Sequence, residues 1–111
     1  MNNAVMFGKA SDEWRTPQAF FDELNLEFRF QWDAAATKAS AKCGPYCYFG
    51  PDHGVTNYVD ALTQEWRCYR TEAIERLWCN PPYSKCGEFV AKAEAEAKHG
   101  ATTVMLIPSR T

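Results

Sequence analysis

The sequence predicts an α/β protein built on an open, mostly parallel sheet. Residues 74–108 have the pattern of a strand, a loop, a helix and a second strand, which is a βαβ unit. Residues 28–33 alternate aromatic and polar side chains, the pattern of a further strand. The chain has 111 residues, so we expect a single domain with one core over residues 1–111.

The first expected elements are an arm and a helix. Residues 1–13 are weakly patterned, and we expect a mobile arm there. Thr16 is a good N-cap and Pro17 suits the first helical position, so the two residues predict a helix start. A buried stripe follows at helical spacing, formed by Phe20, Phe21 and Leu24. Asn25 is the expected end of this helix.

The predicted strand over residues 28–33 carries Asp33 at its carboxyl end. The small residues Ala34 to Ala36 follow, and they could begin a helix that packs close to the sheet. Residues 43–58 contain three glycines and two prolines, which indicates an irregular stretch. Residues 60–62 are a candidate turn.

Residues 74–79 predict a second strand, and residues 80–83 must end it because two prolines cannot continue a central ladder. Ser84 could cap the next helix. The buried face of that helix would carry Phe89, Val90, Ala93 and Ala97, and its exposed side Lys92, Glu94, Glu96 and Lys98. His99 and Gly100 would end it. Residues 102–107 are β-branched and apolar up to Pro108, typical of a parallel strand buried on both faces.

Three residues fall at the carboxyl ends of the predicted strands: Asp33, Asn80 and Pro108. In open parallel sheets, ligands bind beyond these ends. The sequence therefore predicts a binding site at this edge of the sheet, where the three residues fall.

The Asn80-Pro81-Pro82-Tyr83 loop has a composition suited to binding an amino group. Its prolines fix two φ angles and remove two N–H donors, so the loop is stiff and rich in acceptors. The Asn80 side-chain oxygen and the Pro81 carbonyl could together accept both N–H bonds of an exocyclic amino group. Tyr83 offers a flat face for a flipped base. The alternative is a proline-rich turn with no chemical role.

Composition excludes some classes of function. The net charge is −2 and no segment forms a basic stripe, so DNA contacts would have to come from scattered residues such as Lys38, Lys42, Arg67 and Arg70. No apolar run approaches the length needed to span a bilayer, and no signal peptide is visible. We expect no membrane partner and a cytoplasmic location.

Five cysteines is an odd number, and reduced thiols are the expected state. A zinc-bound structural domain is an alternative that would use Cys43, Cys47 and His53. No second tight pair of ligands completes such a site, so we expect no metal.

The motifs together resemble the phage-type DNA N6-adenine methyltransferases, a Dam-like family with an NPPY loop. The resemblance runs through Asp12 to Pro17, Phe20-Phe21, residues 28–36, Leu77 to Ser84 and Val104 to Thr111. It implies a Rossmann-like fold that depends on S-adenosylmethionine, with double-stranded DNA as the substrate. A phage or prophage origin would place the protein in a bacterial host cell.

The resemblance also implies roles for single residues. Asn80, Pro81, Pro82 and Tyr83 would be catalytic. The cofactor segment would span residues 14–42, with Trp14, Thr16 and Pro17 near the methionine end of S-adenosylmethionine. Asp33 and Ala34 resemble the acidic strand end of the cofactor loop, and Asp33 could instead be a helix N-cap. Asp60 resembles a second acidic contact, to the adenosine, with a solvated turn as the alternative.

Two features depart from the family pattern. No glycine-rich loop follows the first predicted strand, where the sequence reads Asp33-Ala34-Ala35-Ala36-Thr37. Relatives continue past the position of Thr111, so we expect a sheet that is incomplete at the C-terminus, with its last strand as an open edge. A homodimer or a C-terminal partner fragment would cover that edge.

Three alternatives remain at this point. The chain could be an inactive truncated remnant or an interaction module that retains a methyltransferase-like fold. It could be the zinc-bound domain described above. The chemistry could also be retained with a different acceptor, either cytosine N4 or a protein glutamine.

Overall fold

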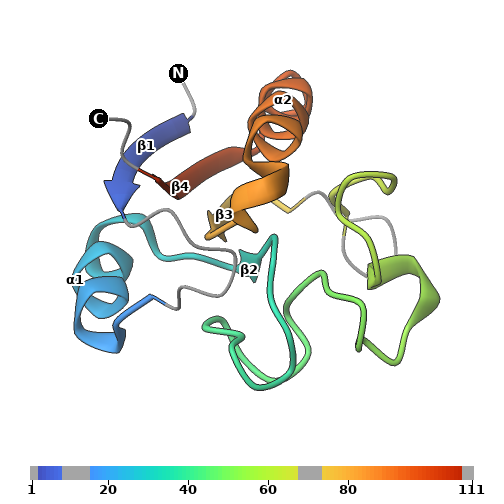
Figure 1. Ribbon diagram of the computed structural model, residues 1–111, viewed down its shortest axis with the longest axis horizontal. Coiled ribbons are helices and arrows are strands. Elements are labelled where there is room, and N and C mark those ends of the chain that lie inside the picture. The colour runs from blue at the N-terminus through green and yellow to red at the C-terminus, as the bar shows by residue number, and fades with distance from the viewer. Residues whose placement is uncertain (1–2, 9–15, 68–73, 109–111) are drawn as a thin grey trace.

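A four-stranded parallel sheet forms the centre of the molecule, which the computed structural model describes for residues 3–8, 16–67 and 74–108 (Figure 1). The spatial order of the strands is β1-β4-β3-β2, and every pairing is parallel. The strands are β1 (Asn3–Gly8), β2 (Trp32–Asp33), β3 (Arg76–Cys79) and β4 (Thr102–Pro108). The predicted α/β class with a parallel sheet is therefore confirmed.

Two helices cover opposite faces of this sheet, α1 (Gln18–Phe28) and α2 (Cys86–Ala97). Successive residues of a strand point to opposite faces, so the interior strands supply two separate clusters. Phe21 of α1 packs with Trp78, Val104 and Leu106 on one face. Phe89 and Ala93 of α2 pack with Leu77, Cys79 and Met105 on the other.

The predicted βαβ unit is present as β3, α2 and β4. Residues 103–106 of β4 are all buried, as the apolar run predicted. Gly100 has a φ of 98° after the end of α2, a conformation that glycine adopts without strain. The predicted end of this helix is thus confirmed.

The mobile arm predicted over residues 1–13 is wrong for residues 3–8. These residues form β1, which pairs with β4 from Asn3↔Thr103 to Gly8↔Pro108. Strand β4 consequently lies between β1 and β3 and is not an edge. The reason for expecting a homodimer or a C-terminal partner fragment is therefore lost.

The N-terminal helix differs from its prediction at both ends. Pro17 is the N-cap residue and Thr16 does not cap the helix. The helix passes Asn25 and continues to Phe28, after which Arg29 takes a left-handed φ of 55°. Asn25 accepts a hydrogen bond from the Phe30 backbone N–H at 2.8 Å, so its side chain stabilises the turn that follows the helix.

The strand predicted over residues 28–33 contains only Trp32 and Asp33. Phe28 and Phe30 stack with their ring centroids 5.6 Å apart, and Phe30 also contacts Trp78. Phe28, at the end of α1, and Phe30 therefore belong to the cluster between α1 and the sheet, whereas Trp32 packs on the other face. In a strand, the same residues would have pointed to a single face of the sheet.

Two further predictions about helices are wrong. No helix follows Asp33, because residues 34–55 form turns and extended segments up to the short 3-10 helix η1 (Thr56–Tyr58). Ser84 does not cap α2, since the 3-10 helix η3 (Tyr83–Lys85) intervenes and Lys85 is the N-cap residue. The irregular stretch over residues 43–58 and the turn at residues 60–62 are both present.

Glu96 was expected on the exposed side of α2 but is buried. It accepts hydrogen bonds from Lys92 Nζ at 2.7 Å and from the Trp66 backbone N–H at 3.4 Å. Among the described residues, no helix is both long and apolar enough to cross a membrane.

Candidate functional site

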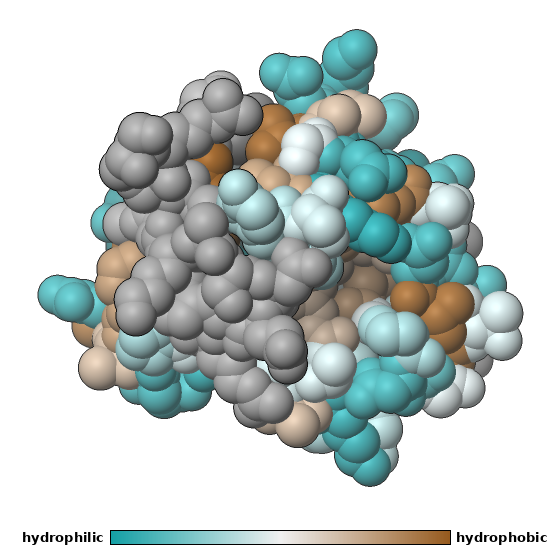
Figure 2. Space-filling view, in the orientation of Figure 1, coloured by the Kyte–Doolittle hydropathy of each residue, from teal (hydrophilic) through white to brown (hydrophobic). Residues whose placement is uncertain are grey.

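A cavity of about 700 Å³ opens at the carboxyl ends of β2 and β3. Figure 2 shows this face of the molecule, hollowed beside hydrophilic residues. The lining side chains come from four separate parts of the chain. These are Thr16, the segment that begins at Asp33, the irregular segment 49–62, and the end of β3 with the start of α2. This volume lies in the range of small-molecule sites, which is about 300–1,000 Å³.

Asp33 lies at one end of the cavity and is almost fully buried. Its Oδ1 accepts from the Ala35 backbone N–H at 3.2 Å and its Oδ2 from the Lys42 backbone N–H at 3.4 Å. Burial raises the pKa of this carboxyl to about 7, and the two backbone hydrogen bonds and the Lys42 charge lower it only in part. A cationic ligand group would favour the ionised form.

The loop after β2 is held against the segment that follows it. Asp33 forms a parallel bridge with Tyr48, and the Ala36 backbone N–H donates to the Phe49 carbonyl at 3.0 Å. A Cβ atom at Gly50 would lie 1.8 Å from the Ala36 carbonyl oxygen, so only glycine permits this approach. The contact fixes one wall of the cavity.

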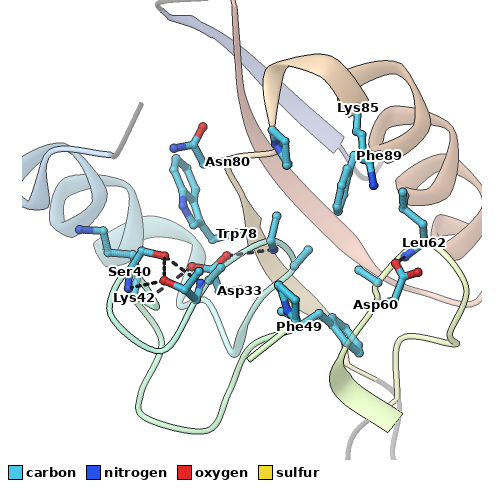
Figure 3. Close-up of a pocket in the computed structure, with 18 of the residues that line it drawn as sticks. Asp33, Ser40, Lys42, Phe49, Asp60, Leu62, Trp78, Asn80, Lys85 and Phe89 are labelled. Carbon is cyan, nitrogen blue, oxygen red and sulfur yellow. Dashed lines mark hydrogen bonds between the residues drawn. The ribbon is translucent and has the colours of Figure 1, made fainter. Parts of the chain in front are cut away.

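The other end of the cavity is mainly apolar. Figure 3 shows Leu62 and Phe89 there, with Phe49 between them and Asp33, whose backbone carbonyl accepts from the Phe49 N–H at 2.9 Å. Asp60 lies at the same end, and its Oδ1 accepts from the Leu62 backbone N–H at 2.9 Å. An elongated ligand with an apolar ring system and a cationic end would match this distribution.

Asn80 follows β3 directly and lies on the cavity wall above Trp78 (Figure 3). Its Nδ2 donates a hydrogen bond to Thr16 Oγ1 at 3.2 Å, and Thr16 is buried. Pro82 also lines the cavity, whereas Pro81 is buried and Tyr83 is half exposed. The stiff loop thus starts at the cavity and places its tyrosine toward solvent.

The cavity brings together most of the residues that the sequence singled out. Those lining it are Thr16, Asp33, Ala34, Asp60, Asn80 and Pro82. Pro17 is exposed and, with Pro81 and Tyr83, is not among the lining residues. Trp14 and Arg70 lie outside the described residues. Asp33 does not cap a helix, because none follows it; its carboxylate instead caps a turn.

Several lining residues were missed by the sequence reasoning, notably Ser40, Phe49, Leu62, Lys85 and Phe89. Phe89 belonged to the predicted buried face of its helix and is buried there, so the helical pattern gave no sign that it also lines the cavity. Asp60 was the one residue of segment 49–62 that the sequence reasoning assigned to the site; the others carry no periodic pattern, so no local signal assigned them.

The alternative zinc site is not supported by the geometry of its candidate ligands. His53 Nε2 is 3.1 Å from the Tyr46 carbonyl and Nδ1 accepts from the Val55 backbone N–H at 3.0 Å, so both ring nitrogens are engaged. Burial and the neighbouring Asp33 raise the pKa of the Cys43 thiol, which disfavours the thiolate that zinc requires. Within the described ranges, no three potential ligands form a metal-binding group.

A scan against protein families gives one result that bears on this site. The family described as DNA N-6-adenine-methyltransferase (Dam) matches residues 5–111, which is nearly the whole chain. The chain belongs to this family. Neither the curated proteins nor the solved structures gave a match. Membership of the Dam family relates the protein to the adenine-N6 DNA methyltransferases, and the matched region contains the cavity and the Asn80 loop.

Proposed function

We propose that this protein is a DNA methyltransferase that moves a methyl group from S-adenosylmethionine to adenine N6. The observation that carries the proposal is the position of the Asn80 loop on the wall of a cavity that also contains a buried carboxyl group, Asp33. The Dam family relation supports the reaction, and the parallel sheet with helices on both faces supports a Rossmann-like arrangement.

The residues of the cavity fit S-adenosylmethionine. Asp33 offers a carboxylate to the cofactor's ammonium group or ribose hydroxyls, and a cationic partner would offset the cost of burying that charge. Phe49, Leu62 and Phe89 offer an apolar surface for the adenine ring, with Asp60 beside them. When bound, S-adenosylmethionine supplies an electrophilic methyl group to a nitrogen nucleophile.

The Asn80 loop would orient the adenine amino group. The Asn80 side-chain oxygen and the Pro81 carbonyl would each accept one N–H bond of that group, which directs its lone pair away from the acceptors. Fixed acceptors that stabilise developing positive charge on the nitrogen also lower the barrier. The half-exposed Tyr83 offers its ring to stack with a flipped base.

Double-stranded DNA is the proposed partner and the cytoplasm the proposed compartment. Lys38 is exposed, and Lys42 and Lys85 line the cavity, so three cations lie near the site despite the net charge of −2. Such scattered contacts to phosphate would give modest affinity with a marked dependence on salt.

Incubation with unmethylated DNA and S-adenosylmethionine tests the proposal. We expect N6-methyladenine in the digested DNA, identified by mass spectrometry. The Asn80→Ala variant should lose at least about 100-fold in kcat, the usual effect of removing one oriented polar group from an active site. Its unfolding midpoint should stay close to that of the wild type.

Four outcomes would contradict this assignment. N4-methylcytosine in place of N6-methyladenine would change the acceptor, as would methylation of a protein glutamine. Full activity in Asn80→Ala would remove the loop from the mechanism. A folded protein with no transfer to any of these acceptors would favour an inactive or non-catalytic interaction module.

A further inference from the structure

Thr16 and Asn80 are 64 residues apart in the chain, yet their side chains form a hydrogen bond of 3.2 Å with Asn80 Nδ2 as the donor. Both residues line the cavity, and Thr16 is buried. The family resemblance led us to expect Thr16 beside the cofactor. In the structure Thr16 also contacts the loop that carries the proposed catalytic amide.

We propose that Thr16 is a positioning residue that fixes the orientation of the Asn80 side-chain amide. The inference rests on the proposed function, in which Asn80 accepts a hydrogen bond from the target amino group. The two ends of an amide are similar in size, but one is a donor and the other an acceptor. When Thr16 Oγ1 accepts from Asn80 Nδ2, the acceptor oxygen Oδ1 points away from Thr16. Rotation of the amide by half a turn would exchange the positions of the nitrogen and the oxygen.

The fold keeps the two partners in register. Thr16 precedes Pro17, the N-cap residue of α1, so the start of that helix sets its position. Phe21 of α1 packs edge-to-face on Trp78, two residues before Asn80, with ring centroids 5.6 Å apart. The helix and the end of β3 are therefore packed together, and the hydrogen bond joins two supported segments.

Two substitutions at this position separate the possible roles. Thr16→Val keeps the shape of the side chain and removes the hydroxyl, and Thr16→Ser keeps the hydroxyl. Loss of a single polar contact corresponds to about a 10- to 100-fold change in rate. We expect Thr16→Val to lower kcat by about that factor and to leave the affinity for S-adenosylmethionine within about twofold. Thr16→Ser should recover most of kcat.

Two kinetic results would overturn the proposal. If Thr16→Val weakens cofactor binding and retains kcat, Thr16 contacts the cofactor and does not position Asn80. If both quantities are unchanged, the hydrogen bond has no role in the reaction.

The side-chain amide of Asn80 gives a readout that needs no activity. Its pair of resonances in a ¹⁵N NMR spectrum can be identified by its absence in Asn80→Ala. We expect the pair to shift in Thr16→Val and to stay near its wild-type position in Thr16→Ser. An unmoved pair in Thr16→Val would contradict the contact. Because this measurement does not require methyl transfer, it distinguishes failure of the inference from failure of the proposed function.

Discussion

Asp33 is the residue whose chemistry depends most on its surroundings. It was predictable as a strand-end carboxylate, because the alternation of aromatic and polar residues over 28–32 ends at this acid. Its burial and the backbone donors that hold it were not predictable, since they come from a loop that the sequence suggested as a helix. The contact between Thr16 and Asn80 spans 64 residues and leaves no local pattern either.

The raised pKa of Asp33 predicts that cofactor binding depends on pH. Because the pKa is about 7, the ionised fraction in the free protein rises from about one tenth at pH 6 to about nine tenths at pH 8. If only the carboxylate binds the cationic cofactor, affinity should increase about tenfold over this range. Tryptophan fluorescence titrations at several pH values would measure it.

Asp33→Asn is the matched control, since it keeps the size of the side chain but does not titrate. Its cofactor affinity should be lower at pH 8 and nearly independent of pH. A pH-independent affinity in the wild type would exclude Asp33 from the cofactor site.

The raised pKa of Asp33 also affects the stability of the free protein. A carboxyl whose pKa is raised by folding contributes stability below its unfolded value of 3.8, and this contribution is lost as the pH rises toward 7.

Elements with long periodic sequence patterns were predicted well. Elements that depend on contacts with residues distant in the chain were not. The unit β3-α2-β4 was recognised because its helix and its buried final strand have clear patterns. Strand β1 was missed because its stability comes from pairing with β4, about 100 residues away in the chain. The segment at residues 28–30 was mistaken for a strand, because aromatic residues packed beneath a helix can alternate as they do in a sheet.

Helix α2 yields a prediction about stability. Glu96 is buried and accepts from Lys92 Nζ and the Trp66 backbone N–H, so Glu96→Ala leaves two donors without this acceptor. We expect the free energy of unfolding to fall by about 1–3 kcal/mol. Glu94→Ala, at an exposed position of the same helix, should change it by less than about 0.5 kcal/mol. Urea denaturation of both variants would measure the difference, and equal effects would show that the buried contacts add no stability.

Over the whole molecule, the fold places four separate segments around one cavity. The sequence located the two strand ends, because parallel strands end at a common edge. Apart from Asp60, which the family resemblance suggested, it could not locate the wall formed by segment 49–62, where tight contacts such as Gly50 against Ala36 hold an irregular chain. A short helix with a buried aromatic face, α1, carries Thr16 to the same site.

Calorimetric titration of S-adenosylmethionine into the 111-residue protein at pH 8 tests most directly whether this cavity is a cofactor site. We predict saturable binding of one cofactor per chain. Binding should be weakened at least about tenfold in Asp33→Ala, because that variant loses one charged contact to the cofactor. Equal binding by Asp33→Ala would mean that the cofactor lies elsewhere. No binding to a protein that is folded by NMR would contradict the proposed function and leave the chain with the fold of its family but without the reaction.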